Sequence, residues 1–328
     1  MKKHPQAQEI KTLLDQSQKI AIFGHRNVDG DALGSCLWLG QVLENQWKEV
    51  NYFTTQTPST SFDFLEWSSK FQINFDYHPH YDLLIFLDTA NPAQLLWDFW
   101  VGHEEYFDKM PTLVIDHHIS NTNYADTNLV DDSSIATCEI MAELLQDLYT
   151  DEIDAKVATY LFLWLSTDSW HFIYERDSTR TFEVATFLLS RWADNKSIIS
   201  NLYRAASYKS IKFVWVLTER ITKIPGVIYT YYRHEELEEY GVDKEKAGSI
   251  LGIMTRIAHD GVFALIKIHD HESPAFLKAS LRSKSDDVDV SQIAGQWGGG
   301  WHVKAAGLKT MIWDDWESEL ESFVGKLQ

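Results

Sequence analysis

Three short apolar segments in the first half of the chain are each followed at once by histidine or aspartate. The segments are Lys19–Gly24, Tyr81–Leu87 and Pro111–Ile115. The residues that follow them are His25, Asp88 and the run Asp116-His117-His118. Apolar runs of this length are typical of strands that are covered on both faces. Because the carboxyl ends of parallel strands meet at one edge of a sheet, we expect these polar side chains to converge there.

Segments with helical periodicity alternate with these strands. They are Asp31–Gln46, Ser134–Tyr149, Ile153–Leu165 and Ser178–Trp192, and one more strand-like segment is Glu49–Thr54. This alternation predicts an α/β fold with a largely parallel sheet flanked by helices. A second, smaller α/β pattern begins near Ser207, with strands at Gly226–Tyr232, Phe263–Ile268 and Phe276–Arg282 and a final helix at Trp316–Leu327. The predicted domains are therefore 1–195 and 207–328, joined by a linker at 196–206.

Composition narrows the class of protein. The 328 residues suffice for two domains, and no apolar stretch approaches the roughly 18 residues of a membrane span. The net charge of -19 argues against tight binding to long duplex DNA, which requires a basic surface. Two cysteines cannot form a zinc knuckle or a disulfide framework. With no apolar signal segment at the N-terminus, we expect a cytoplasmic protein.

The segment after the first strand reads His25-x3-Asp29-x-Asp31. Asp29 and Asp31 flank Gly30, so the two carboxylates could reach two different cations from one loop. Gly24 and Gly30 would permit a tight backbone path. The alternative is a structural role, in which an Asx turn is followed by Asp31 as the N-cap of the next helix.

The other three acidic positions also have a structural alternative. Asp88 ends a buried strand, where a carboxylate is costly unless it is paired or metal-bound, but it could cap the segment that follows. Adjacent histidines on a strand point in opposite directions, so one of His117 and His118 could bind a metal while the other faces a substrate. Asp116 could then orient one of the imidazoles. The structural alternative is that all three residues lie in a polar loop. Asp168 follows another apolar segment and needs a partner. Together, such oxygen and nitrogen ligands suit two divalent cations and phosphoester hydrolysis.

A glycine-rich segment near the C-terminus is a candidate phosphate site. Backbone N–H groups can approach an anion closely at Gly298, Gly299 and Gly300, where no Cβ intervenes. His302 follows this segment, and Arg282 precedes it in a locally basic strip. We therefore expect these residues to bind a phosphate group.

These motifs carry a resemblance to the DHH phosphoesterase superfamily over nearly the whole chain. His25–Ser35 is similar to the HxNxDgDalGS motif, Asp116-His117-His118 to the DHH motif, and Thr167-Asp168-Ser169 to TDS. Gly298–Gly307 is similar to the GGGxHxxAAG signature of the DHH-associated C-terminal domain. The length resembles that of the stand-alone group of nanoRNases and 3'-phosphoadenosine 5'-phosphate (pAp) phosphatases. Two departures are Val28 in place of proline and Trp170 in place of glycine.

The resemblance implies a role for each of these residues. Two Mn²⁺ ions are expected, with Mg²⁺ or Co²⁺ as alternatives. One ion would be held by His25 and Asp29, the other by Asp31, His117 and Asp168, and Asp88 would bridge the two. The resemblance also implies that Asp116 contacts the metal ligands without binding a metal itself, and that His118 faces the scissile phosphate. The residues implied to grip a second phosphate, across an active-site cleft between the two domains, are Arg282, Gly298, Gly299, Gly300 and His302.

The activity that the resemblance implies is hydrolysis of short 5'-phosphorylated oligonucleotides to mononucleotides, of pAp to AMP, or of both. The implied partners are short single-stranded RNA or DNA or a nucleoside bisphosphate, and a homodimer. The alternative substrates are cyclic or linear dinucleotides. An inorganic pyrophosphatase fits less well, because the second domain of that group lacks the GGGxHxxAAG pattern. A different class is a catalytically silent nucleotide-binding protein.

Overall fold

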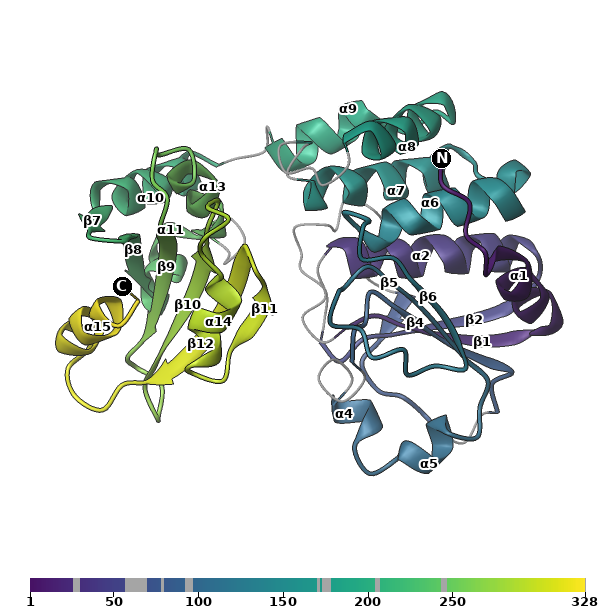
Figure 1. Ribbon diagram of the computed structural model, residues 1–328, viewed down its shortest axis with the longest axis horizontal. Coiled ribbons are helices and arrows are strands. Elements are labelled where there is room, and N and C mark those ends of the chain that lie inside the picture. Colours follow the sequence, from purple (N-terminus) through teal and green to yellow (C-terminus); the bar gives the residue numbers. More distant parts are fainter. Residues whose placement is uncertain are drawn as a thin grey trace. The chain divides into compact units, whose positions relative to one another are not determined.

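The computed structural model divides the chain into two compact units, Met1–Arg204 and Ala205–Gln328, which we call the first and second units (Figure 1). The structure describes residues 1–25, 30–56, 70–77, 80–91, 97–169, 172, 178–203, 207–242 and 247–327. Within these ranges it describes only the backbone at Trp97, Asp98, Asp168, Ser178, Leu202, Tyr203, Trp301 and His302. No helix in the described ranges is long and apolar enough to cross a membrane.

The first unit is built on a sheet of six parallel strands, as the sequence predicts. In sheet order the strands are β3 (Phe71–Gln72), β2 (Glu49–Phe53), β1 (Lys19–Phe23), β4 (Leu83–Leu87), β5 (Thr112–Asp116) and β6 (Thr127–Val130). The central strands β1, β4 and β5 are the three that the apolar segments predicted. Their neighbouring positions bring their carboxyl ends to one edge of the sheet.

Helices cover both faces of this sheet (Figure 1). The helical elements of the unit are α1 (Ala7–Gln16), α2 (Gly30–Asn45), α4 (Trp97–Trp100), α5 (Glu104–Phe107), α6 (Thr137–Leu148), η3 (Thr150–Glu152), α7 (Ala155–Asp168), α8 (Ser178–Ser190), α9 (Asn195–Ile198) and η4 (Ile199–Tyr203). Ile20 and Ile22 point to the core beneath α2, α6 and α7, whereas Ala21 and Phe23 point to an aromatic core on the other face. Because both faces are covered, the consecutive residues Ile20–Phe23 of β1 and Leu83–Leu87 of β4 are all apolar.

Helices α2 and α7 pack very closely, and the contact explains two glycines. A Cβ at Gly30 would lie 2.0 Å from the Trp164 ring, and one at Gly34 would lie 1.3 Å from it. Gly30 is the first residue of α2 and has no left-handed φ. It is needed because the Trp164 ring occupies the space that a side chain would fill.

The expected connector at 196–206 is largely helical. Residues Asn195–Ile198 form α9, and Ile199–Tyr203 form the π-helical segment η4. The N-terminal polar segment is also helical as α1, whose Ile10 and Leu14 are fully buried.

The second unit contains a six-stranded mixed sheet. In sheet order the strands are β11 (Gly300–His302), β12 (Ala305–Met311), β10 (Phe276–Arg282), β9 (Val262–His269), β8 (Val227–Arg233) and β7 (Thr222–Ile224), and only β8 and β9 pair in parallel. The helices are α10 (Tyr208–Glu219), α11 (His234–Tyr240), α13 (Ile250–Met254), α14 (Val290–Gly295) and α15 (Trp316–Gly325). Separate apolar cores lie on the two faces of this sheet.

Candidate metal centre

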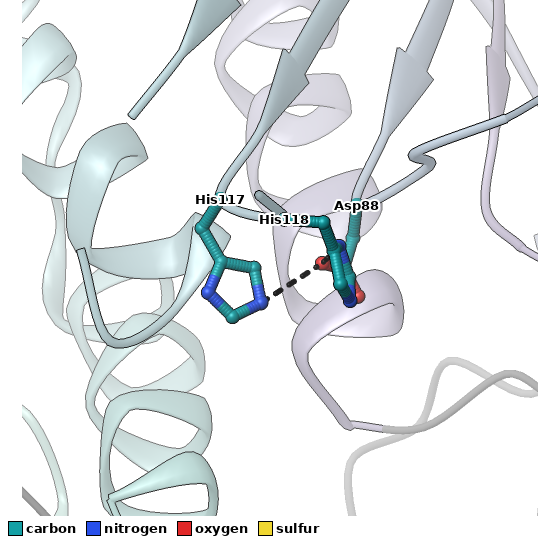
Figure 2. Close-up of side chains that lie close together, drawn as sticks. All are labelled: Asp88, His117 and His118. Carbon is teal, nitrogen blue, oxygen red and sulfur yellow. Dashed lines mark ion pairs between the residues drawn. The ribbon is translucent and has the colours of Figure 1, made fainter. Parts of the chain in front are cut away.

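Three histidines that follow strands β1 and β5 surround the carboxylate of Asp88. Figure 2 shows two of them, His117 and His118. Oδ2 of Asp88 lies 3.4 Å from His25 Nε2, and its Oδ1 lies 3.5 Å from His117 Nε2 and 3.6 Å from His118 Nδ1. Asp88 directly follows β4, His25 follows β1 by two residues, and His117 directly follows β5. The structure therefore brings together the polar groups that the three apolar segments placed at one sheet edge.

Asp88 has an unusual backbone conformation. Its φ is +57°, in the left-handed region, which costs a non-glycine residue about 1–2 kcal/mol. The carboxylate is 2% exposed, and its Oδ1 accepts a hydrogen bond of 3.0 Å from Thr137 Oγ1. This bond comes from α6, so Asp88 turns toward a distant helix rather than toward the segment that directly follows it. Burial opposes ionisation, but the hydrogen bond from His25 and the charges of His118 and His117 hold the pKa of Asp88 below its usual range.

Asp31 is fully buried and caps a helix, although not its own. Its Oδ2 accepts from the Thr137 N–H at 2.6 Å, and its Oδ1 accepts from the Cys138 N–H at 2.8 Å. These are the first two amides of α6, where the helix dipole favours an anion. The residue expected as an N-cap of α2 therefore serves α6, and Oδ2 lies 4.0 Å from His117 Nε2.

His117 presents one defined nitrogen to the two carboxylates. Its Nδ1 lies 3.4 Å from the Ser134 carbonyl oxygen. Because a carbonyl can only accept, Nδ1 carries the proton and Nε2 carries the lone pair. Burial lowers the pKa of His117 despite the nearby charge of Asp88, which favours this neutral form. The lone pair of Nε2 thus faces carboxylate oxygens of Asp88 and Asp31, an arrangement that a bound cation would stabilise.

Both carboxylate oxygens of Asp116 accept hydrogen bonds from groups of the protein. Its Oδ1 accepts from His118 Nδ1 at 2.7 Å and from the His117 N–H at 2.9 Å, and its Oδ2 accepts from Asn121 Nδ2 at 2.6 Å. Burial alone would lower the pKa of His118, but this hydrogen bond and the charge of Asp88 raise it to about 9. Asp116 therefore orients a protonated imidazole at neutral pH.

The expectation that His117 and His118 point in opposite directions is wrong. Strand alternation does not apply to them, because β5 ends at Asp116. Both rings turn toward Asp88, with centroids 4.5 Å apart (Figure 2).

The donor atoms fit a divalent cation. Asp88, His117 and His118 each bring one oxygen or nitrogen within 4.8 Å of the others. Asp88 and His117 can act as ligands, whereas the protonated His118 ring is held by Asp116 and lies beside them. Carboxylate and imidazole groups without thiolates suit Mn²⁺ or Mg²⁺ better than a soft metal. Both cysteines are buried, and the Cys138 sulfur lies 3.2 Å from Ser35 Oγ.

Comparison with known proteins assigns the domain that carries this site. Residues 19–163 match the DHH family, N-terminal domain, and they include β1, β4, β5 and the cluster around Asp88. Residues 19–163 therefore form a DHH-family N-terminal domain.

Relatives resemble the chain beyond the DHH domain. The chain is 23% identical over 300 residues to the bifunctional oligoribonuclease and PAP phosphatase NrnA of Bacillus subtilis, covering 89% of this chain and 90% of that protein. It is 23% identical over 313 residues to the cyclic-di-AMP phosphodiesterase GdpP of Geobacillus thermodenitrificans, covering 90% of this chain and 45% of GdpP. An exopolyphosphatase-related protein from Bacteroides fragilis shares the fold, with a TM-score of 0.85 at 18% identity over 98% of this chain and 95% of that one.

Two predicted ligands of the DHH domain are described incompletely or not at all. Asp29 lies outside the described residues, as do Val28 and Trp170. Asp168 is the last residue of α7, and its side chain is not described. Their assignment as metal ligands stays a prediction.

The predicted phosphate-binding residues lie together in the second unit. Arg282 ends β10 and pairs with Ala305 of β12, which in turn pairs with His302 of β11. Gly298 has a φ of +70°, and a Cβ at Gly299 would lie 2.2 Å from the Gly307 carbonyl oxygen. These glycines are therefore required by the backbone whether or not a phosphate binds.

Two lysines near them, Lys284 and Lys304, are engaged within the protein. Lys304 pairs with Asp286 at 2.9 Å, and the Lys284 ammonium donates to the carbonyls of Thr255 and Ile257.

Sequence reasoning missed three residues that hold the DHH site. Thr137 binds Asp88, Asn121 binds Asp116, and the Ser134 carbonyl binds His117. A threonine at the start of a helix is ordinarily expected to cap it. Its hydroxyl instead donates to Asp88 at the end of β4, and no local sequence pattern predicts that contact.

Proposed function

We propose that this protein is a two-metal phosphoesterase that hydrolyses short 5'-phosphorylated oligonucleotides to mononucleotides, pAp to AMP, or both. The observation that carries the proposal is the convergence of the buried His25, Asp31 and Asp88 with the half-buried His117, whose nitrogens and carboxylate oxygens approach within 3.4–4.0 Å. A cation among these ligands would further offset the repulsion between the buried carboxylates.

We assign the ligands as follows. His25 and Asp29 would hold one ion, Asp31, His117 and Asp168 would hold the other, and Asp88 would serve both. We propose Mn²⁺, since hard oxygen ligands and imidazole suit it. When bound, two such ions acidify a water molecule and stabilise negative charge on phosphoryl oxygens.

His118 has a separate role in the proposed reaction. Asp116 holds its Nδ1 at 2.7 Å, and its pKa of about 9 keeps the ring protonated at neutral pH. A fixed cationic donor beside the proposed metal ligands can stabilise charge that develops on the phosphoryl or leaving oxygen. Asp116 is the group that keeps this donor in place.

Two similarities support the choice of substrate. The relative from Bacillus subtilis is named for oligoribonuclease and PAP phosphatase activities, and the alignment covers most of both proteins. The second unit carries Arg282, Gly298–Gly300 and His302, which we propose bind a second phosphate. A requirement for two phosphates would favour short oligonucleotides and bisphosphates over long chains.

A second candidate is a cyclic or linear dinucleotide phosphodiesterase. The similarity to GdpP favours it, although the chain covers 45% of that relative. A nucleotide-binding protein without activity is the alternative from another class.

A substrate panel with Mn²⁺ separates these candidates. The wild type and Asp88→Asn would be incubated with pAp, 5'-phosphorylated dinucleotides, two-to-five-residue RNAs and cyclic dinucleotides, and the products would be identified. We expect mononucleotides from the short RNAs, or AMP from pAp, and no turnover by Asp88→Asn together with weaker Mn²⁺ binding. Exclusive cleavage of cyclic dinucleotides would select the second candidate. Near-normal turnover by Asp88→Asn would refute the two-metal assignment, and inactivity of the wild type on every substrate would favour the binding protein.

A further inference from the structure

A buried glutamate that the proposed mechanism does not use lies close to the metal centre. Glu139 is the third residue of α6 and is 1% exposed. Its Oε2 accepts from Ser134 Oγ at 2.6 Å and from the Ile135 N–H at 3.2 Å. A buried carboxylate is costly to desolvate and is stable only with such donors. Glu139 thereby fixes the segment that joins β6 to α6.

The same segment contacts a proposed metal ligand. The Ser134 carbonyl oxygen lies 3.4 Å from His117 Nδ1 and, as argued above, sets which nitrogen carries the proton. We propose that Glu139 is a positioning residue of the metal centre, which fixes Ser134 so that its carbonyl holds His117 with Nε2 free for a metal. This inference rests on the proposed function for its metal, but the His117 tautomer can be tested without one.

The carboxylate of Glu139 is itself held from a second helix. Thr181 Oγ1 of α8 donates to Oε1 at 2.8 Å, and Arg180 Nε of the same helix lies 3.6 Å from Oε2. The segment is also tied to the sheet, because the Ser134 N–H donates to the Asp131 carbonyl at 3.1 Å. Ser134 is therefore fixed from both sides. Glu139 supplies the shorter of the two contacts to its hydroxyl, and the Ala136 carbonyl oxygen supplies the other at 2.9 Å. Partners behind a metal-binding histidine commonly set its tautomer and orientation in this way.

Glu143 offers a matched control. It lies one turn further along α6, is also buried, and shares Arg180, whose Nη2 lies 2.6 Å from Oε2 of Glu143. Its other contacts are with the His4 imidazole and the Lys2 N–H, far in sequence from Ser134. Truncation of Glu143 removes a buried carboxylate from the same helix and the same arginine, but it leaves the contact to Ser134 intact.

The test measures Mn²⁺ binding by calorimetry on the full-length, metal-free protein and the His117 tautomer by ¹⁵N NMR, with His117→Gln used to assign the signal. We expect Glu139→Ala to raise the Mn²⁺ dissociation constant roughly 10–100-fold, as loss of a partner behind a ligand typically does. The Nδ1–H signature of His117 should also be lost. Glu139→Gln should lie closer to the wild type, because its amide oxygen can still accept from Ser134 and Ile135. Glu143→Ala should lower the unfolding temperature and leave both readouts unchanged.

Two results would overturn the inference. One is wild-type Mn²⁺ affinity together with an intact His117 signature in Glu139→Ala. The other is an equal loss of Mn²⁺ affinity in Glu143→Ala, which would assign the effect to general destabilisation. If Glu139→Ala fails to fold, Ser134→Ala removes the same contact while keeping the main-chain carbonyl, and the same loss is expected. If the wild type binds no Mn²⁺, the proposed function fails, whereas the tautomer of the metal-free variants still decides this inference.

Discussion

The close packing of α2 against α7 predicts that Gly34→Ala destabilises the first unit. A Cβ at Gly34 would lie 1.3 Å from Trp164 Cδ1 and 1.9 Å from Trp164 Nε1. Trp164 is fully buried, so the ring has no open space into which it can move. Overpacking a core typically costs about 1–3 kcal/mol, and so severe an overlap places this change at about 3 kcal/mol. Replacing glycine by alanine in a helix returns about 0.5–1 kcal/mol, leaving a net loss of about 2 kcal/mol.

The loss is measurable by thermal unfolding followed by circular dichroism. For a domain of about 200 residues, 1 kcal/mol shifts Tm by about 2–4 °C, so we expect a decrease of about 4–8 °C. Gly325→Ala is a control, since Gly325 also lies in a helix and a Cβ there would meet nothing within 4 Å. It should keep or raise Tm. A Gly34→Ala protein as stable as the wild type would refute the reasoning, because it would show that Trp164 yields without cost.

Three further predictions concern Thr137, the carboxylates of Asp131 and Glu143, and His302. Thr137→Val removes the hydroxyl that donates to Asp88, so the free energy of unfolding of the metal-free protein, measured in urea, should fall by about 1–3 kcal/mol. The control Thr218→Val, at an exposed threonine, should change it little. Equal stabilities of the two variants would contradict the prediction. Burial raises the pKa of Asp131 and Glu143, but their contacts outweigh it. Contacts with Lys2 and Arg180 hold the pKa of Asp131 below its ordinary 3.8, and contacts with His4 and Arg180 hold the pKa of Glu143 below its ordinary 4.5. These groups contribute their full stability above their ordinary pKa values and lose it as the pH falls through the lowered pKa values. The free energy of unfolding measured in urea should therefore decrease below about pH 4.5. A free energy of unfolding that stays constant down to about pH 3 would contradict this. His302→Ala should raise KM for substrates with a terminal phosphate and leave kcat unchanged, and an unchanged KM would remove His302 from substrate binding.

The sequence predicted the sheet because its central strands carry an unmistakable signal. β4 and β5 are buried at all five positions, and their sequences contain five and three consecutive apolar residues, a pattern typical of strands covered on both faces. β6 has only two strongly apolar residues, Leu129 and Val130, and lies at the sheet edge, which explains why it was missed. α1 was missed because most of its residues are polar, although the two that are fully buried, Ile10 and Leu14, lie four apart on one helix face.

The contacts that fix the site were harder to predict because they join distant parts of the chain. Asp31 binds amides that are 106 and 107 residues away, and Asp88 binds a hydroxyl 49 residues away. A pattern of residue types indicates which side chains could bind a metal. It does not predict which helix N-terminus will pack against those side chains. The same limit applies to Gly30 and Gly34, whose necessity depends on where Trp164 packs.

These distant contacts show how the fold keeps three carboxylates together at one sheet edge. Each is stabilised by donors of a different kind: the amides of α6 for Asp31, the Thr137 hydroxyl for Asp88, and His118 with Asn121 for Asp116. Two of the three therefore depend on the first residues of α6, and the segment before that helix also contacts His117. The N-terminus of α6 offsets the repulsion between the carboxylates before any cation is present. Any displacement of this helix end would move Asp31, Asp88 and His117 together, so it is the element on which the geometry of the site depends most.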